Sequence, residues 1–284
     1  MDQKVVLITG ATSGLGLATV ARFTEDPDWI IIAGYRKTSD TTDLFSYAKM
    51  HSFIRPMILD VTHPADQARV IEKIKKDYGR LDCLVNNAGF GFIGPIEDFS
   101  LSEMHEQFET NFFGSLTMTN ASLPLMRDSG GGRVIMISSV NGRVTFPLYG
   151  MYAASKYAIE AAGEALAMEV AKFGITVSLI EPGMFQTNFW KNRRSPLLTD
   201  SKTSVYHDMT ARYFEKLKKA KQSKMMNTGM CDPYRIAEAA YSIATAPHPG
   251  FRYPVGIGSR LFHLMDTITP KFIKFFFARR ALGW

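Results

Sequence analysis

Three polar side chains in the middle of the chain could carry acid–base chemistry. Tyr152 and Lys156 lie four residues apart in an Ala-rich helical segment, so both project from one helix face. A phenol has a pKa of about 10, and a neighbouring ammonium lowers it by stabilising the phenolate. Ser139 follows a strand-like run, so its hydroxyl could hold a carbonyl oxygen while Tyr152 delivers a proton. A Tyr-x-x-x-Lys pair alone is typical of an exposed helix face, and the preceding strand and serine favour a reactive centre.

A glycine-rich segment, TGATSGLG at 9–16, stands between the first strand-like run and the first helical stretch. Glycines there permit a tight turn, let backbone N–H groups approach a pyrophosphate, and place it at a helix N-terminus. Glycines also end strands for steric reasons, and the spacing here differs from the G-x-G-x-x-G motif. The prediction of a dinucleotide-binding turn therefore depends on the position of this segment directly after a strand. The predicted cofactor contacts are Gly10, Thr12, Ser13, Gly14, Leu15 and Gly16.

Arg36 follows the second strand-like run, where a dinucleotide fold places the adenosine ribose. An acidic residue there binds a free 2′-hydroxyl, whereas a cation accommodates a 2′-phosphate. The chain has no Asp or Glu between Trp29 and Ser39, so Arg36, helped by Lys37 and Ser13, predicts NADP(H) as the cofactor. The alternative is a solvated surface arginine.

Apolar runs alternate with helical stretches along most of the chain. The runs are rich in β-branched residues and end at Gly, Asp or Asn, which is typical of parallel strands buried on both faces. They are 4–9, 29–33, 57–59, 83–85, 133–137, 176–180 and 251–257, the last holding a Pro and so expected near an edge or a strand end. The helical stretches are 14–25, 39–50, 64–78, 102–127, 151–173, 203–222 and 233–246. This alternation predicts an α/β fold with a doubly wound parallel sheet of about seven strands and helices on both faces.

Several motifs together resemble the short-chain dehydrogenase/reductase family, whose members have a single Rossmann-type domain. They are TGATSGLG (9–16), LDVT (59–62), NNAG (86–89), TNFFGS around Asn111, SS (138–139), YAASK (152–156) and PGMFQT (182–187). The resemblance implies catalytic roles for Asn111, Ser139, Tyr152 and Lys156. It also implies that the cofactor is bound by Asp60, Val61, Asn87, Ala88, Gly89, Tyr152, Lys156, Pro182, Gly183 and Thr187. Asn111 is similar to an asparagine that supports a water relay to the lysine, and Lys156 is also implied to bind the nicotinamide ribose.

Within that family the chain is similar to 17β-hydroxysteroid dehydrogenases and retinol dehydrogenases, through FGFIGPIED (90–98) and PHPGFRYPVG (247–256). This resemblance implies NADP-dependent interconversion of a lipophilic alcohol and its ketone or aldehyde. An apolar pocket fits that class, and the candidate lining residues are Phe146, Pro147, Tyr149, Met184, Phe185, Phe189 and Trp190. The same residues could instead belong to an ordinary core or to a subunit interface.

The chain, 1–284, is expected to form one Rossmann-type domain with a substrate lid at 188–228 and a basic, apolar tail at 260–284. Residues 191–284 hold 17 Lys/Arg against 6 Asp/Glu, a net charge of +11, which indicates an anionic partner or a solvated basic face. Aromatic residues among cations at 271–284 suit an interfacial helix on an anionic bilayer. Packing of this tail on its own domain is the other reading.

Two cysteines exclude a disulfide scaffold and a cysteine-based zinc site, so no metal is expected. No run of 18 apolar residues and no secretory leader are present, so the expected location is cytoplasmic, with the tail as a peripheral membrane contact. The expected partners are a small lipophilic substrate and further copies of the chain in a dimer or tetramer. The basic residues follow no recognised nucleic-acid module. An NADPH-binding regulatory protein with weak or no turnover is the alternative function, and the intact Ser139–Tyr152–Lys156 set favours the enzyme.

Overall fold

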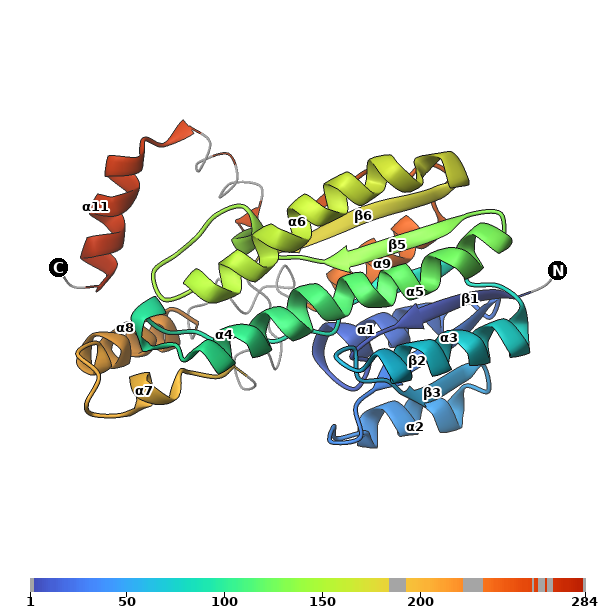
Figure 1. Ribbon diagram of the computed structural model, residues 1–284, viewed down its shortest axis with the longest axis horizontal. Coiled ribbons are helices and arrows are strands. Elements are labelled where there is room, and N and C mark those ends of the chain that lie inside the picture. The colour runs from blue at the N-terminus through green and yellow to red at the C-terminus, as the bar shows by residue number, and fades with distance from the viewer. Residues whose placement is uncertain are drawn as a thin grey trace.

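The computed structural model describes residues 3–183, 193–221, 232–256, 258, 259, 264 and 268–282. Within them lies a seven-stranded sheet of order β3-β2-β1-β4-β5-β6-β7, in which every neighbouring pair is parallel (Figure 1). The strands are β1 (Lys4–Ile8), β2 (Trp29–Tyr35), β3 (Ile54–Ile58), β4 (Cys83–Asn86), β5 (Gly132–Ile137), β6 (Ile175–Pro182) and β7 (Arg252–Val255). The predicted doubly wound parallel sheet of a Rossmann-type fold is confirmed.

Helices cover both faces of the sheet because alternate strand residues point to opposite sides. Val5 and Leu7 pack into one apolar cluster, with side chains from α3 (Pro64–Tyr78), α5 (Gly114–Asp128) and α6 (Gly150–Val170). Val6 and Ile8 pack into a second, with side chains from α1 (Gly14–Phe23), α2 (Thr42–Met50) and α9 (Tyr234–Thr245). Both faces of the central strands are therefore buried, which explains why these runs are almost wholly apolar.

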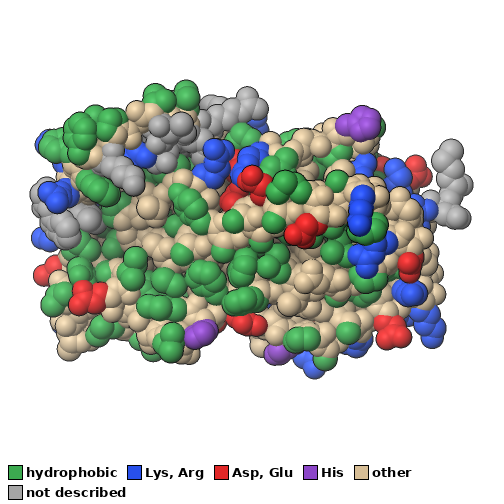
Figure 2. All heavy atoms as spheres, turned by 45° about the horizontal axis from the view of Figure 1, so that its top comes forward, with side chains coloured by type: hydrophobic (Ala, Val, Ile, Leu, Met, Phe, Trp, Pro, Cys, Tyr) green, Lys and Arg blue, Asp and Glu red, His purple; other side chains and the backbone are tan. Residues whose placement is uncertain are grey.

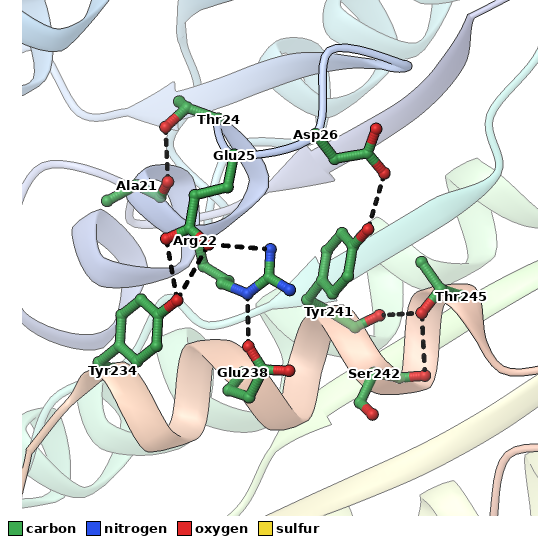
Figure 3. Close-up of polar contacts among 10 residues, drawn as sticks. All are labelled: Ala21, Arg22, Thr24, Glu25, Asp26, Tyr234, Glu238, Tyr241, Ser242 and Thr245. Atoms are coloured by element: carbon green, nitrogen blue, oxygen red, sulfur yellow. Dashed lines mark hydrogen bonds and ion pairs between the residues drawn. The ribbon is translucent and has the colours of Figure 1, made fainter.

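The contact between α1 and α9 fixes the helix that begins at the glycine-rich turn. Arg22 on α1 forms an ion pair with Glu238 on α9, and its guanidinium lies 3.6 Å from the ring centroid of Tyr241 (Figure 3). The Tyr241 hydroxyl donates to Asp26 at 2.7 Å, just beyond the end of α1. A helix from the last part of the fold therefore holds the first helix in place.

Two predicted boundaries were wrong for local reasons. The strand predicted at 57–59 begins earlier, because β3 is an edge strand and tolerates Pro56, which has no N–H to donate. The helix predicted at 102–127 is divided into α4 (Leu101–Phe108) and α5 by a π-helical turn at Glu109–Phe113. Such turns occur often at functional sites, and this one contains Asn111.

The remaining α-helices of the described residues are α7 (Leu197–Asp200), α8 (His207–Lys221) and α11 (Lys271–Leu282). They gather at one end of the molecule (left in Figure 1), beyond the carboxyl ends of the strands. None of the helices in the described part of the chain combines the length and apolar composition needed to cross a bilayer.

The strand order reverses between β1 and β4. The chain runs outward from β1 to β3 and then crosses back to β4, so the loops after β1 and β4 lie side by side. In open α/β sheets, ligands bind in the crevice outside the carboxyl ends of the strands at such a switch point. The fold therefore places the glycine-rich turn after β1 and the NNAG segment after β4 together.

Candidate active site

Ser139 and Tyr152 meet at the carboxyl end of β5. Ser139 is the second residue after β5, and its Oγ accepts a hydrogen bond from the Asn141 backbone N–H at 3.1 Å. Tyr152 lies in the first turn of α6, and the Ser139 and Tyr152 side chains are hydrogen-bonded to each other. Both residues are 7% exposed. The serine hydroxyl and the phenol can therefore contact the same atom of a substrate.

Burial raises the pKa of Tyr152 to about 12, and the hydrogen bond with Ser139 opposes this only in part. The sequence-based expectation that Lys156 lowers the pKa of Tyr152 is wrong for this structure. The Lys156 ammonium lies 5.9 Å from the centroid of the Tyr152 ring, and its Nζ donates to the Ile137 carbonyl at 2.8 Å. Desolvation of the phenolate therefore dominates, and Tyr152 is a protonated phenol at neutral pH.

Lys156 is a buried cation. Burial lowers its pKa to about 8, and the negative charge of Glu160 opposes this shift. An ammonium with such a pKa changes its charge close to physiological pH, whereas an exposed lysine does not. Whether Lys156 is charged near neutral pH therefore depends on how strongly the carboxylate of Glu160 offsets the effect of burial.

Asn111 is fixed in the π-helical turn by the loop after β4. Its Oδ1 accepts from the Phe90 N–H at 3.0 Å, and its Nδ2 donates to the Phe90 carbonyl at 2.9 Å and to Ser155 Oγ at 3.2 Å. A Cβ on Gly89 would lie 3.1 Å from Asn111 Oδ1 and 3.8 Å from Lys156 Nζ. Asn111 and Lys156 therefore face the same glycine, and only glycine leaves the space between them open.

The glycine-rich turn is locked to the NNAG segment by backbone contacts. Thr9 Oγ1 accepts from the N–H groups of Asn87 and Ala88, each at 3.0 Å. Asn87 Nδ2 donates to the carbonyls of Thr9 and Gly10 at 2.9 and 3.0 Å. A Cβ on Gly16 would lie 2.2 Å from the Gly10 carbonyl oxygen, and Gly10 itself has a φ of +64°. Close packing and backbone conformation therefore require glycine at Gly10 and Gly16, two of the residues expected to contact the cofactor.

Helix α1 begins immediately after this turn. Gly14 has a φ of +55°, and Ser13 is the extended N-cap residue, whose side chain makes no capping hydrogen bond within the described residues. The first turn of α1 holds no acidic residue. Thr12 and Leu15, two further predicted contacts, flank this position and are half-buried. The N-terminal N–H groups of α1 and its dipole are suited to a phosphate.

The second predicted cofactor region follows β2 and β3. Arg36 and Lys37 are exposed just beyond the end of β2. The Asp60 carboxylate accepts from the Thr62 backbone N–H at 2.9 Å and from its hydroxyl at 2.7 Å, so it stabilises the turn after β3. Val61 is 5% exposed, inside this turn.

Two further predicted cofactor residues end β6. Pro182 is the last residue of β6, and the N–H of Gly183 donates to the Val255 carbonyl at 2.9 Å. Thr187, the remaining predicted contact, lies outside the described residues.

A separate apolar cluster surrounds the Tyr152 ring. Its buried members are Ile93, Leu148, Tyr149, Tyr152 and Met209, with Phe146, Tyr206, Tyr213 and Phe214 packed around them. Phe146 and Tyr149 are expected from the sequence, whereas the residues from α8 are not, because nothing in the sequence places that helix near Tyr152. Met184, Phe185, Phe189 and Trp190 lie outside the described residues, and Pro147 is half-buried beside the cluster.

Leu148 has an unusual backbone next to Tyr152. Its φ is +70°, a region that costs a residue with a Cβ about 1–2 kcal/mol. Its carbonyl accepts from the Gly94 N–H at 2.8 Å, and its side chain is buried in the apolar cluster. The loop after β4 and the start of α6 are thus tied together at the cluster, and the strain indicates a functional constraint.

Part of the predicted lid, 188–228, docks on the loop after β4. Arg194 donates its N–H to the Gly91 carbonyl at 3.0 Å, and its own carbonyl accepts from Ile93 at 2.9 Å. Further along, Thr199 and Ser204 donate their hydroxyls to the buried Asp98 carboxylate at 2.7 and 2.8 Å. This segment therefore borders the apolar cluster. Within the described residues there is no group of three His, Cys, Asp or Glu side chains that could hold a metal.

Known proteins share both the sequence and the fold. The model of the short chain dehydrogenase family matches residues 4–197. A 3-ketodihydrosphingosine reductase from Bacteroides thetaiotaomicron is 36% identical over 256 residues, covering 90% of this chain and 89% of that protein. Human retinol dehydrogenase 8 is 31% identical, covering 89% and 82%. The chain therefore belongs to the short-chain dehydrogenase family of oxidoreductases and resembles its retinol dehydrogenase branch.

Solved structures agree with this assignment. A short-chain dehydrogenase from Streptomyces avermitilis has a TM-score of 0.79 to this chain at 29% identity, covering 98% of both. The closed form of a serine dehydrogenase complexed with NADP+ has a TM-score of 0.73 at 25% identity, covering 88% of this chain and 94% of that one.

Proposed function

We propose that this protein is an NADP(H)-dependent oxidoreductase that interconverts a lipophilic alcohol and its ketone or aldehyde, with Tyr152 as the proton donor. The observation that carries this proposal is the hydrogen-bonded Ser139–Tyr152 pair, with Lys156 one turn along α6, inside an apolar cluster. A regulatory protein that only binds the cofactor has no need of such a pair.

The residues after β1, β2 and β4 fit a dinucleotide. The glycine cradle at Gly10 and Gly16 would be filled by any Cβ, and the N-terminus of α1 presents N–H groups to a pyrophosphate. Arg36 and Lys37 are exposed at the position of the adenosine ribose, which supports a 2′-phosphate. The serine dehydrogenase of similar fold is complexed with NADP+, which supports this cofactor. The other proposed contacts are Thr12, Ser13, Gly14, Leu15, Asp60, Val61, Asn87, Ala88, Gly89, Pro182, Gly183 and Thr187.

When bound, the nicotinamide supplies or accepts the hydride. Ser139 Oγ and the Tyr152 hydroxyl hold the substrate oxygen between them, and the phenol proton passes to that oxygen as the carbonyl is reduced. The raised pKa of Tyr152 suits a donor at neutral pH. Lys156 supplies a positive charge and a ribose contact, and Asn111 on the other side of Gly89 supports proton return to Lys156.

The apolar cluster supports a lipophilic substrate. Met209, Tyr213 and Phe214 on α8 bring aromatic and flexible aliphatic side chains to the Tyr152 ring. Pockets that bind small molecules are mostly apolar with few polar groups, and here the polar groups are the Ser139 and Tyr152 hydroxyls. Two relatives have lipid-derived substrates in their names, a ketodihydrosphingosine and a retinol.

The C-terminal helix supports a peripheral contact with an anionic membrane. Phe272 and Phe275 on α11 are 72% and 61% exposed, and α11 carries four cations and no acidic residue. Figure 2 shows hydrophobic side chains beside basic ones at the end of the molecule where α11 lies. We propose that the protein is cytoplasmic and that this end, next to α8, contacts a membrane surface. We also propose that residues 188–228 act as the substrate lid of a single domain. This domain would assemble into a homodimer or homotetramer.

The test is turnover on a panel of carbonyl compounds. NADPH oxidation would be followed with 3-ketodihydrosphingosine, retinal, a 17-ketosteroid and a small water-soluble aldehyde. The proposal expects turnover with at least one lipophilic compound, at a kcat/KM well above that of the small aldehyde. If the protein binds NADPH but turns over none of these compounds, the result contradicts the proposed activity and supports a regulatory protein that only binds the cofactor.

A further inference from the structure

A buried cluster of charges lies one helical turn beyond Lys156. Glu160 on α6 and Glu181 on β6 both face Arg252 on β7. Arg252 Nη1 contacts the Glu160 carboxylate and lies 2.9 Å from Glu181 Oε1, and its Nη2 lies 2.9 Å from Glu164. The Glu181 and Glu160 side chains are 0% and 6% exposed, whereas that of Glu164 is 60% exposed. Three separate elements therefore bring two buried carboxylates to one guanidinium.

This cluster touches the turn that carries Ser139. A Cβ on Gly142 would lie 2.9 Å from Glu160 Cγ and 2.7 Å from Ser138 Oγ, so the turn packs directly on Glu160. The Gly142 N–H donates to the Ser139 carbonyl at 2.8 Å, which closes the turn. Glu160 is thus in contact with the backbone that positions Ser139.

The same glutamate lies one helical turn from the catalytic lysine, and its negative charge favours the ammonium form of that lysine. Lys156 and Glu160 are four residues apart on α6, so their side chains lie on one helix face. Around the Lys156 ammonium are the Ile137 carbonyl from β5, the Tyr152 ring from α6 and Asn111 beyond Gly89. None of these three groups is charged, and among the described residues Glu160 is the acidic residue whose charge acts on Lys156.

The positive and negative charges of the buried groups are equal in number only if Lys156 is counted together with Arg252, Glu160 and Glu181. Two buried carboxylates against one guanidinium leave a net negative charge, and a buried ammonium needs a compensating anion. Charges a few ångströms apart interact strongly in a partly desolvated site. Around Glu160 the charged groups are Arg252 from β7, Glu181 from β6, and Lys156 and Glu164 from α6, with the Ser138 hydroxyl beside them.

We propose that Glu160, held by Arg252 beside Glu181, is a positioning residue that provides the counter-charge of the Lys156 ammonium and seats the turn behind Ser139. Its effect on turnover rests on the proposed function, because it acts through Lys156. Its effect on the ionisation of Lys156 does not depend on which substrate the enzyme uses.

The first test is the pH profile of NADPH-dependent reduction for E160Q, with E164Q as the matched control. Both variants remove a carboxylate that contacts Arg252, but only E160Q removes the carboxylate whose charge acts on Lys156. In E160Q the alkaline limb of kcat moves to lower pH by about one unit, because the charged form of Lys156 loses its counter-charge. In E164Q, whose carboxylate is exposed, the midpoint stays within about 0.3 units of the wild type.

The second test reads Lys156 without turnover. The pKa of Lys156 in the folded state, about 8, is below its ordinary value of 10.5. The unfolded chain therefore binds the extra proton between those values, and stability rises with pH across that window. E160Q lowers the folded value further, so its urea midpoint gains more between pH 7 and pH 10 than that of the wild type or E164Q.

A uniform loss of kcat in E160Q at every pH, with an unchanged pH dependence of unfolding, would overturn the proposal. Absence of wild-type turnover with a shifted unfolding profile in E160Q would instead remove the proposed function and leave this inference standing. If E160Q does not fold, E181Q replaces it, because this variant removes the other buried carboxylate on Arg252 and keeps Glu160. Glu160 then still supplies the counter-charge, so the alkaline midpoint stays within about 0.3 units of the wild type. A fall of about one unit in E181Q would contradict the assignment of this role to Glu160.

Discussion

The two halves of the candidate active site, the proposed cofactor side and the proposed substrate side, are built in different ways. On the cofactor side, the turns after β1 and β4 are joined by backbone groups and by the short side chains of Thr9 and Asn87. On the substrate side, α8 and the start of α6 meet through large apolar side chains such as Met209 and Tyr149. Backbone contacts demand particular small residues, whereas apolar packing accepts many combinations of similar volume.

This difference explains why the sequence predicts one side better than the other. Gly10 and Gly16 are required by contacts that any Cβ would obstruct, so their identity carries information. Met209 and Phe214 are ordinary apolar residues in an amphipathic helix, and only the fold brings them to Tyr152. The identities of residues on the proposed cofactor side are therefore informative in the sequence, whereas those on the proposed substrate side are not.

Among the variants that test this comparison, Gly16→Ala on the cofactor side has the largest expected effect on binding. The new Cβ would meet the Gly10 carbonyl oxygen and Asn87 Nδ2, at 2.2 and 2.5 Å, and the backbone must move. We expect NADPH affinity to fall by about 100-fold or more, since the loss of several phosphate contacts costs at least about 3 kcal/mol. Fluorescence titration with NADPH measures it. Gly250→Ala is the control, because its Cβ would meet nothing nearer than 3.6 Å. Equal affinities for the two variants would refute the glycine cradle.

A smaller effect on the same side is expected from Arg36→Ala. A charge-assisted hydrogen bond to a 2′-phosphate contributes about 1.5–3 kcal/mol, so NADPH should bind about 10-fold or more weakly. NADH lacks that phosphate and should be nearly unaffected. Lys49→Ala, which removes an exposed cation from α2, controls for overall charge. An equal loss for both cofactors, or a wild-type preference for NADH, would remove Arg36 from the site.

The smallest effect is expected at the far end of the substrate side. Phe272→Ser with Phe275→Ser should weaken sedimentation with anionic vesicles several-fold, because each exposed ring removes apolar insertion. Added salt should weaken it further through screening of the basic residues. Met50→Ser is the control, since Met50 is 68% exposed on α2. Unchanged sedimentation of the double variant, or loss of folding on truncation after Pro270, would indicate a tail that packs on its own domain.

The sequence predicts the sheet well and the details of the centre less well. Buried parallel strands are almost wholly apolar, so the alternation of apolar runs with helical stretches predicts a parallel sheet covered on both faces, whereas the order of the strands comes from the structure. The π-helical turn at Asn111 could not be predicted from the sequence, because it inserts one extra residue into the helix and packing decides where that insertion falls. The pKa of Tyr152 was predicted from its neighbour Lys156, but it is decided by burial, which depends on the whole fold. The cluster of Glu160, Glu181 and Arg252 joins residues far apart in the chain, and nothing local indicates it.

The central claim is that the Ser139–Tyr152 pair transfers a proton to a lipophilic carbonyl beside the bound cofactor. Tyr152→Phe tests it most directly, because it removes only the hydroxyl. General acid–base catalysis contributes about 10²–10⁴-fold, and the phenol also anchors the carbonyl, so kcat should fall toward the upper end. NADPH affinity, measured by fluorescence, should stay within about two-fold of the wild type, because the phenol contributes little to cofactor binding. A variant that binds NADPH normally and keeps more than about a tenth of wild-type turnover would contradict the account.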